Sequence, residues 1–282
     1  MSVAPRTIDL RESLNAISDV VVNRPPPIRE FDQIYMKVAD MLLQAEYVGG
    51  LFDNRRVVFV GDGDAIALCV MHLHKRGLIQ GGPKRALVLD FDERVVNSIR
   101  EFAKQFKLSR TVTARLYNVA EAIPKELWQD HEAFYTNPPY GSGNGGTSVE
   151  AFLRRAFELC RPDALGCLVI ADSAGYPWCG EVLVNTQRFL LDNGFAILEV
   201  LRGVHRYHLA DAPDLTSCNI AVKGCGRKPQ RYQSRPLDGV TLLDFYGRAA
   251  PLKARYVRDL RGGGKYPSRD YRIESLDLER QG

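Results

Sequence analysis

The stretch VVFVGDGDAIAL, Val57–Leu68, decides the fold class. Its first four residues form a short, continuous apolar run, which is typical of a strand in a parallel sheet that helices cover on both faces. Two glycines then allow a sharp turn, and residues 65–76 have the apolar spacing of a helix. The stretch therefore predicts a buried strand, a tight turn and a helix in succession.

The same alternation repeats along the chain. We expect further strands at 86–89, 111–117, 133–136, 166–171, 195–202 and 216–223, and helices at 8–20, 31–47, 93–106, 149–160 and 182–193. Strands separated by helices imply right-handed crossovers and a doubly wound, Rossmann-like α/β sheet that is mostly parallel. Because no convincing helix joins the last two strands, we expect them to form an antiparallel hairpin at one edge.

Composition divides the 282 residues into an N-terminal arm at 1–30, a Rossmann-like domain at 31–224 and a basic C-terminal extension at 225–282. Pro25–Pro27 separate the arm from the domain. From residue 227 to the end, 13 Lys and Arg stand against 7 Asp and Glu, a net of +6. Such an extension favours nucleic acid as a partner or serves as a solvated surface. Within it we expect one strand at 240–246 and flexibility at Gly262–Gly264.

Composition also argues against several classes of protein. Apolar residues make up 45% of the chain and charged residues 26%, as in an ordinary globular protein. No apolar run is long enough to span a membrane, and the N-terminus lacks the apolar core of a signal peptide, so we expect a cytoplasmic protein. Six cysteines without a CxxC pair and five scattered histidines predict buried free thiols and no metal.

Glycines and carboxylates follow the first strand, where an open α/β sheet binds its ligands. Gly61 and Gly63 let the backbone approach a ligand closely. Asp62 and Asp64 suit a cationic ligand, or cap the helix that follows. The pattern departs from GxGxxG, and two carboxylates repel a pyrophosphate, so a nicotinamide cofactor is disfavoured.

The ends of the next two strands carry polar residues as well. Asp90 ends the second strand and is well placed to hold ribose hydroxyls, whereas Asp92 is expected to cap a helix. Asn118 follows the third strand and is a candidate to pair with an adenine edge.

The stretch FYTNPPYGSGNGG, Phe134–Gly146, ends the fourth strand on a rigid corner. Two prolines fix the backbone after Asn137, so its amide and the Pro138 carbonyl can accept hydrogen bonds from an amino group. Tyr140 offers a flat face to a planar or cationic substrate, and the glycines after it allow a loop that opens and closes. Alkyl transfer to nitrogen needs an amine oriented in this way.

These motifs in this order resemble the N4-bis(aminopropyl)spermidine synthases, the branched-chain polyamine synthase family, over residues 24–223. The matching pieces are FDQ (31–33), GDGD (61–64), LDFDER (89–94) and NPPYG (137–141). The resemblance implies a class I S-adenosylmethionine (SAM)-dependent methyltransferase-like fold. It also implies aminopropyl transfer from decarboxylated SAM to a polyamine-like amine. The family typically has GDDD and DPP, where this chain has Gly63 and Asn137.

The resemblance also assigns roles to residues. Asp62 and Asp64 face the aminopropyl or amine end, Asp90 holds the ribose, and residues 137–140 hold the acceptor amine. The expected cofactor site comprises Gly61, Asp62, Gly63, Asp90 and Asn118. Asn137 and Pro138 position the amine, Tyr140 stacks on it, and Asp64 or a histidine, His208 or His205, takes up the proton.

Two other functions remain open. Asn-Pro-Pro-Tyr also fits the amino-methyltransferase signature, so a SAM-dependent methylation of a nucleic acid base or a small amine is the first alternative. The Arg154–Arg155 pair suits a nucleic-acid partner in that case. The second alternative is a non-catalytic nucleoside-binding module. Aminopropyl transfer predicts an acidic pocket without a partner for the methionine carboxylate, whereas methylation needs a donor for it near Gly61–Gly63. We also expect a homo-oligomer.

Overall fold

A seven-stranded sheet runs through the computed structural model, which describes residues 9–225, 227–247, 250–261 and 269–276. Its strand order is β3-β2-β1-β4-β5-β7-β6, and β7 alone runs antiparallel to its neighbours. The strands are β1 (Arg56–Val60), β2 (Arg85–Asp90), β3 (Val112–Leu116), β4 (His131–Thr136), β5 (Cys160–Ala171), β6 (Phe195–Arg206) and β7 (Thr216–Gly224). The expected mostly parallel sheet with an antiparallel edge pair is confirmed.

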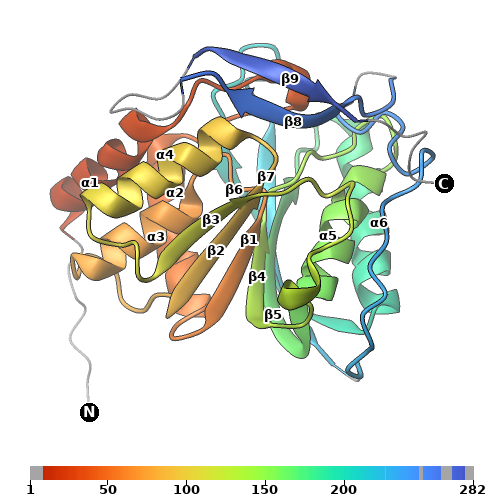
Figure 1. Ribbon diagram of the computed structural model, residues 1–282, viewed down its shortest axis with the longest axis horizontal. Coiled ribbons are helices and arrows are strands. Elements are labelled where there is room, and N and C mark those ends of the chain that lie inside the picture. Colours follow the sequence, from red (N-terminus) through yellow and green to blue (C-terminus); the bar gives the residue numbers. More distant parts are fainter. Residues whose placement is uncertain (1–8, 226, 248–249, 262–268, 277–282) are drawn as a thin grey trace.

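Helices cover both faces of this sheet (Figure 1). On one side lie α1 (Leu10–Asn23), α2 (Val38–Leu51), α3 (Ile66–Lys75) and α4 (Glu93–Gln105), and on the other α5 (Thr147–Leu159) and α6 (Pro177–Asp192). Two 3-10 helices, η1 (Arg29–Phe31) and η2 (Lys125–Leu127), lie in loops. The parallel strands end at one edge of the sheet, where the polar motifs of the sequence gather.

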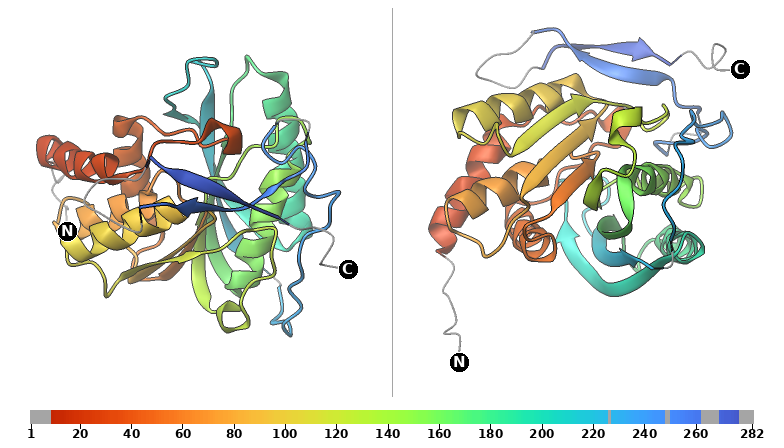
Figure 2. Two further views of the ribbon diagram at one scale, coloured as in Figure 1. Left: turned by 45° about the horizontal axis from the view of Figure 1, so that its top comes forward. Right: turned by 60° about the horizontal axis from the view of Figure 1, so that its bottom comes forward.

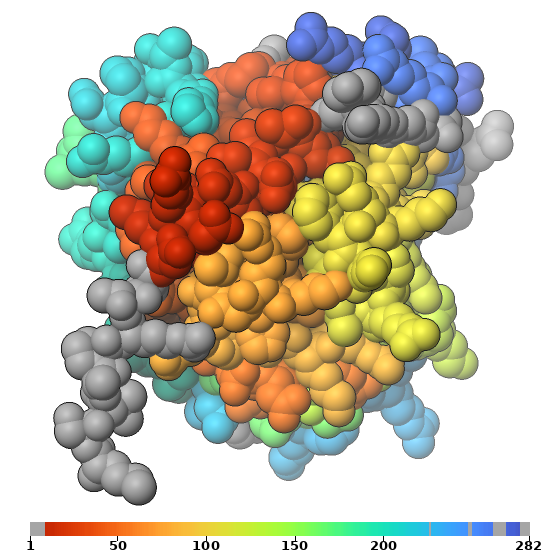
Figure 3. Space-filling view, turned by 90° about the vertical axis from the view of Figure 1, so that its left-hand side faces the viewer, coloured from red at the N-terminus to blue at the C-terminus, as the bar shows by residue number. Residues whose placement is uncertain are grey.

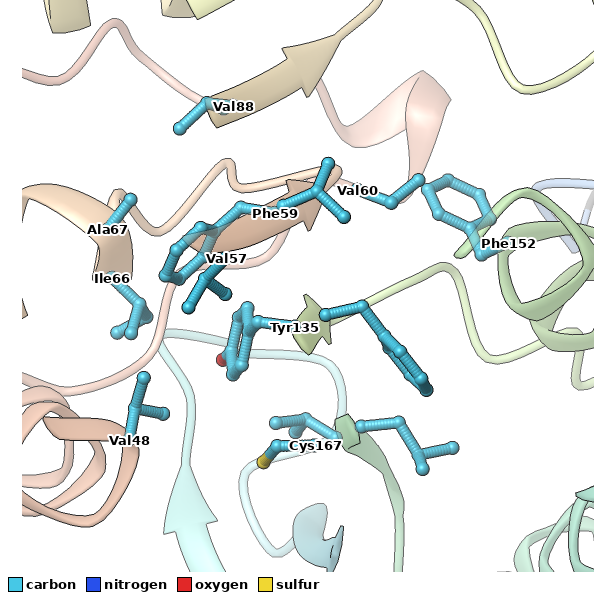
Figure 4. Close-up of a cluster of buried hydrophobic side chains, with 14 of the residues drawn as sticks. Val48, Val57, Phe59, Val60, Ile66, Ala67, Val88, Tyr135, Phe152 and Cys167 are labelled. Carbon is cyan, nitrogen blue, oxygen red and sulfur yellow. The ribbon is translucent and has the colours of Figure 1, made fainter. Parts of the chain in front are cut away.

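The core forms around β1, whose successive side chains point to opposite faces of the sheet. Figure 4 shows Phe59 directed toward Val48 of α2 and Ile66 of α3, and Val60 directed toward Phe152 of α5. The Phe59 and Tyr135 rings lie 5.3 Å apart. Both faces of β1 are therefore buried, as its continuous apolar run predicts.

The N-terminal region is built into the core. Ala16, Ile17 and Val20 of α1 are fully buried, and Figure 3 shows α1 beside α3 and α4. The expected helix at 31–47 starts instead at Val38, because η1 ends at Asp32 in a left-handed conformation (φ 55°) and a loop follows it. The division of the chain at residues 30 and 224 stays a prediction.

The expected strand at 240–246 is wrong, because these residues form turns around an isolated bridge. Leu242 and Phe245 are both fully buried, and a strand places residues three apart on opposite faces. The C-terminal region instead has a β-hairpin, β8 (Ala254–Asp259) and β9 (Tyr271–Ser275). It lies across the carboxyl end of the sheet (Figure 2), where the Val257 N–H donates to the Phe91 carbonyl. The Gly262–Gly264 prediction falls outside the described residues.

Two expectations from composition can be compared with the described residues. Five of the six cysteines are buried free thiols, as expected, and Cys225 is exposed. No helix among the described residues has the length and apolar character to cross a membrane.

Candidate active site

A cavity of about 880 Å³, open solvent at its mouth included, lies at the carboxyl ends of the parallel strands. Its walls come from the bend after β1, the ends of β2 and β3, the Asn-Pro-Pro-Tyr corner after β4 and the loop 31–35. The lining is completed by Phe152, Tyr207, Leu215 and Tyr246. The glycine bend and the proline corner therefore share one rim.

The bend after β1 is held tightly by the protein itself. Gly61 has a φ of +70°, and a Cβ at this position would lie 2.8 Å from the Phe152 ring. Asp62 accepts hydrogen bonds from the N–H groups of Ile66 and Ala67, at 2.8 and 2.9 Å, so it caps α3. Burial raises the pKa of Asp62 well above its usual value. Gly63 and Asp64 line the cavity, whereas Asp62 lies outside its described lining.

Asp90 ends β2 at the cavity wall. Its two carboxylate oxygens accept hydrogen bonds from the N–H groups of Asp62 (3.1 Å) and Asp92 (2.9 Å). Burial, reinforced by the charge of Asp92, raises the pKa of Asp90 to about 7. Asp92 caps α4 through the N–H of Arg94, as expected. Asp90 thus changes charge near neutral pH.

Asp64 connects three parts of the chain. Its Oδ1 accepts hydrogen bonds from the N–H of Met36 (2.8 Å) and from Arg24 Nη1 (3.2 Å). Its Oδ2 accepts one from Asn137 Nδ2 (3.0 Å). Burial raises the pKa of Asp64, and the Arg24 guanidinium opposes that rise. The carboxylate is therefore ordered by its partners and still borders the cavity.

The proline corner presents oxygen atoms at the same rim. Because Asn137 Nδ2 is bound to Asp64, its Oδ1 is the acceptor that the amide turns to the rim. The Tyr140 hydroxyl lies 3.5 Å from Asn137 Oδ1 and 2.6 Å from the Tyr207 hydroxyl. Burial raises the pKa of Tyr140 well above its usual value, so its hydroxyl is neutral. Pro138 lines the cavity beside them.

Asn118 lines the cavity, but its side chain is engaged by the protein. Its Nδ2 donates to the carbonyls of Ala254 (3.1 Å) and Arg255 (2.6 Å), and its Oδ1 accepts from the N–H of Ala120 (2.9 Å). The residue thereby holds β8 over the sheet. Both Nδ2 protons are thus committed, so an adenine edge can pair with this amide only by donating to the second lone pair of Oδ1.

The two candidate histidines occupy different environments. His208 is exposed, lies outside the described cavity lining, and donates its backbone N–H to the Tyr35 carbonyl. His205 is buried between Ser217 and Gln44, and burial lowers its pKa to about 4. His205 is therefore neutral at physiological pH.

The charged residues of the cavity lining are acidic, and the Arg24 guanidinium behind the lining pairs with one of them, Asp64. The described lining includes the carboxylates of Asp32, Asp64 and Asp90, and no Lys or Arg side chain. Arg155 was predicted to contact a nucleic acid. It is instead 1% exposed, and its side chain donates hydrogen bonds to the Val119 carbonyl, to Ser234 Oγ and to the Arg235 carbonyl. That interpretation of Arg155 is wrong, because an apolar helix face carries the residue inward. Among the described residues, no three His, Cys, Asp or Glu side chains gather as a metal site needs.

Sequence reasoning missed several residues of the cavity wall. Tyr207 comes directly after β6, within the stretch VHRYHLADAPD (204–214), where the sequence shows an aromatic residue two positions after His205. Tyr246 has no such signal, since it comes from a C-terminal segment without periodicity. Only the tertiary fold brings it to the site.

The strand order with its one antiparallel strand defines a class I SAM-dependent methyltransferase-like fold. A solved structure from Pyrococcus horikoshii, provisionally described as an RNA methyltransferase, has a TM-score of 0.55 at 16% identity and covers 77% of this chain and 99% of that one. Residues 12–233 match the branched-chain polyamine synthase A C-terminal domain family, and the chain belongs to this family. The expected family is thereby confirmed.

Two curated relatives are named N(4)-bis(aminopropyl)spermidine synthase. The protein from Thermus thermophilus is 29% identical over 192 residues, covering 65% of this chain and 50% of the relative. The one from Thermococcus kodakarensis is 24% identical over 211 residues, covering 72% and 55%. The chain thus spans about half the length of the curated relatives it matches. The solved branched-chain polyamine synthase from Thermus thermophilus has a TM-score of 0.62 at 23% identity, covering 78% of this chain and 67% of that one.

Proposed function

We propose that the chain is an N-alkyltransferase that moves an aminopropyl group from decarboxylated SAM to an amine of a polyamine. The observation that carries this proposal is the acidic cavity beside an ordered amide acceptor, with carboxylates and no described Lys or Arg in its lining. Such a cavity attracts polycations. The Thermus thermophilus structure contains N4-aminopropylspermidine and 5′-methylthioadenosine, an aminopropylated polyamine and the nucleoside that aminopropyl transfer leaves.

The surroundings of the bend favour the decarboxylated donor. Intact SAM carries a carboxylate that needs a cation or free N–H groups. Five N–H groups of the bend already donate to protein oxygens, those of Gly61, Asp62, Ala65, Ile66 and Ala67, which leaves those of Gly63 and Asp64 for a ligand. A carboxylate placed near Asp64 and Asp90 also meets like charge.

The nucleoside fits the wall formed by the end of β2. The ionised Asp90 carboxylate accepts hydrogen bonds from ribose hydroxyls. Leu89, Phe91 and Phe152 add apolar surface for the adenine ring.

The amine reacts from the opposite rim. Asn137 Oδ1 and the Pro138 carbonyl accept its N–H groups, and the Tyr140 ring covers it. The nitrogen lone pair forms a bond to the aminopropyl carbon next to sulfur. The C–S bond breaks, its electron pair returns to sulfur, and the neutral thioether leaves. When the acceptor is a secondary amine, the product is a tertiary ammonium, which gives its N–H proton to Asp64, whose raised pKa suits it to accept one.

Calorimetry with each donor, followed by mass spectrometry of spermidine incubated with it, tests the proposal. Decarboxylated SAM should bind at least about tenfold more tightly than SAM and add 57 Da per transfer, about the mass of C₃H₇N. Preference for SAM, with a methylated amine as product, would support amino-group methylation. This reaction is the second candidate, because the Asn137 amide oriented by Asp64 could also accept a hydrogen bond from an amino group to be methylated. Binding without any product would support a nucleoside-binding module.

A further inference from the structure

A continuous chain of buried polar groups leads away from the proline corner. The Tyr140 hydroxyl is 2.6 Å from that of Tyr207, which is 2.6 Å from Ser217 Oγ. Ser217 Oγ is 2.8 Å from His205 Nδ1, and His205 Nε2 is 2.8 Å from Gln44 Oε1. Gln44 comes from α2, His205 from β6 and Ser217 from β7, whereas the two tyrosines lie in loops, and the series of groups ends inside the protein. Apart from the two tyrosines, these residues lie outside the described cavity lining.

The contacts of Gln44, at the inner end of this series of hydrogen bonds, determine which group donates at each step. As the structure orients the two amides, Gln44 Oε1 accepts from Asn219 Nδ2 (2.7 Å), and Gln44 Nε2 donates to Asn219 Oδ1 (2.9 Å). His205 Nε2, which faces the same Gln44 oxygen, must then carry a proton. The neutral imidazole has only one N–H, so its Nδ1 accepts the Ser217 proton.

The remaining protons follow in order. Ser217 is already a donor to His205, so its oxygen accepts from Tyr207, and the Tyr207 oxygen accepts from Tyr140. The distances agree, because Tyr140 lies 2.6 Å from Tyr207 but 3.5 Å from Asn137 Oδ1. Tyr140 thus donates its only hydroxyl proton to Tyr207, and the lone pairs of its oxygen can accept a hydrogen bond from a ligand.

We infer that His205, Ser217 and Tyr207 are positioning residues that fix the Tyr140 oxygen as a hydrogen-bond acceptor. With Asn137 Oδ1, which Asp64 orients, it forms a pair of acceptor oxygens 3.5 Å apart that selects a ligand nitrogen bearing two N–H groups. A protonated secondary amine, such as the central nitrogen of spermidine, meets this requirement on binding, and it must lose one of its two N–H protons before its lone pair can attack the donor. The inference rests on the proposed function only for the identity of the ligand, a polyamine.

A ligand series of constant charge tests the pair. Spermidine, N4-methylspermidine and N4,N4-dimethylspermidinium carry two, one and no N–H groups on a cationic central nitrogen, and calorimetry at pH 7 gives their affinities. Wild-type protein should bind the last about tenfold or more weakly than the first, since hydrogen bonds to charged groups have that effect. Ser217→Ala frees Tyr207 to donate back to Tyr140, so the ratio should fall below about threefold.

Controls separate positioning from general damage. Ser217→Thr keeps the hydroxyl and should restore the wild-type ratio. Ser13→Ala removes another buried serine oxygen, one without a hydrogen-bond partner, and should leave the ratio unchanged. If circular dichroism shows that Ser217→Ala does not fold, Tyr207→Phe tests the same link. Each protein is characterised by its own ratio of ligand affinities, so the steric effect of the added methyl groups cancels when the ratios of two proteins are compared.

The inference is overturned if the wild type does not bind spermidine, if it binds all three ligands equally, or if Ser217→Ala keeps the wild-type ratio. Aminopropyl transfer is assayed on the same proteins. If aminopropyl transfer occurs but Ser217→Ala keeps the wild-type affinity ratio, the proposed function stands and the inference fails. If Ser217→Ala lowers the affinity ratio but no transfer from decarboxylated SAM occurs, the inference stands and the proposed function fails.

Discussion

The Asn137 side-chain amide donates a hydrogen bond to the Asp64 carboxylate over 3.0 Å. This contact joins the corner after β4 to the bend after β1, two segments that the sequence separates by more than 70 residues. Because the amide nitrogen is committed, its oxygen has one fixed role. An aspartate at this position, which the resemblance implies for the family, would place two carboxylates in contact where this chain has a hydrogen bond.

Asn137→Asp should make stability depend on pH. Two carboxylates in contact cannot both be ionised cheaply, so the pair holds a proton with a pKa raised above that in the unfolded chain. The folded state then binds more protons, and the free energy of unfolding falls as pH rises through the raised pKa. We expect a loss of about 1–3 kcal/mol between pH 5 and pH 8 relative to wild type, measured by urea unfolding. Asn137→Ala adds no charge and should follow the wild-type slope.

Nucleoside affinity should rise with pH through Asp90. Its pKa of about 7 means that the carboxyl is mostly protonated at pH 6 and mostly ionised at pH 8. Ribose hydroxyls donate to the ionised form, so the affinity for 5′-methylthioadenosine should increase roughly tenfold over this range. Calorimetry at both pH values measures it. Asp90→Asn should bind weakly with little pH dependence; an unchanged pH profile in that variant would remove Asp90 from the nucleoside site.

Asn118→Ala should loosen the hairpin more than the sheet. The substitution leaves the Ala254 and Arg255 carbonyls without their donor, a change that costs about 1–3 kcal/mol. Hydrogen exchange should accelerate in β8 while β1 stays protected. Asn118→Asp, which retains only the acceptor for Ala120, should resemble the alanine variant. Unchanged exchange in β8 would show that other contacts hold the hairpin.

Gly166→Ala should destabilise the sheet through one contact. A Cβ at Gly166 would lie 2.1 Å from Phe134 Cζ, and that ring is buried against Phe157 and Phe195. Overpacking of this kind costs about 1–3 kcal/mol, which urea unfolding measures. Gly50→Ala is the matched control, because nothing lies within 4 Å of its Cβ position. As an exposed helical glycine it should gain roughly 0.5–1 kcal/mol.

Local sequence patterns predicted the fold where a single principle dominated. The apolar run of β1 and the caps at Asp62 and Asp92 follow from burial and orphan N–H groups near in sequence. The strand proposed at 240–246 failed because tertiary burial of Leu242 and Phe245 overrode β propensity. The hairpin β8–β9 was missed because polar and charged residues dominate its strands.

The candidate site was predicted in part. The strand-end rule placed Gly61, Asp64, Asp90 and Asn137 around one cavity. It could not show that Asn118 is bound by β8. Nor could it show the hydroxyl chain behind Tyr140, since those partners come from distant elements. Such contacts depend on packing, which no short motif encodes. The homo-oligomer, the nucleic-acid partner and the cytoplasmic location stay predictions.

The place of β7 in the sheet has a consequence for how the molecule is made. Among the described strands β6 pairs with β7 alone, and β7 lies between β6 and β5. During synthesis, β6 therefore leaves the ribosome before its neighbour exists, and β5 keeps an open edge until Thr216–Gly224 emerge. The rim that Tyr207 completes is consequently among the last parts of the sheet to assemble, so a nascent chain arrested before β7 lacks a finished pocket.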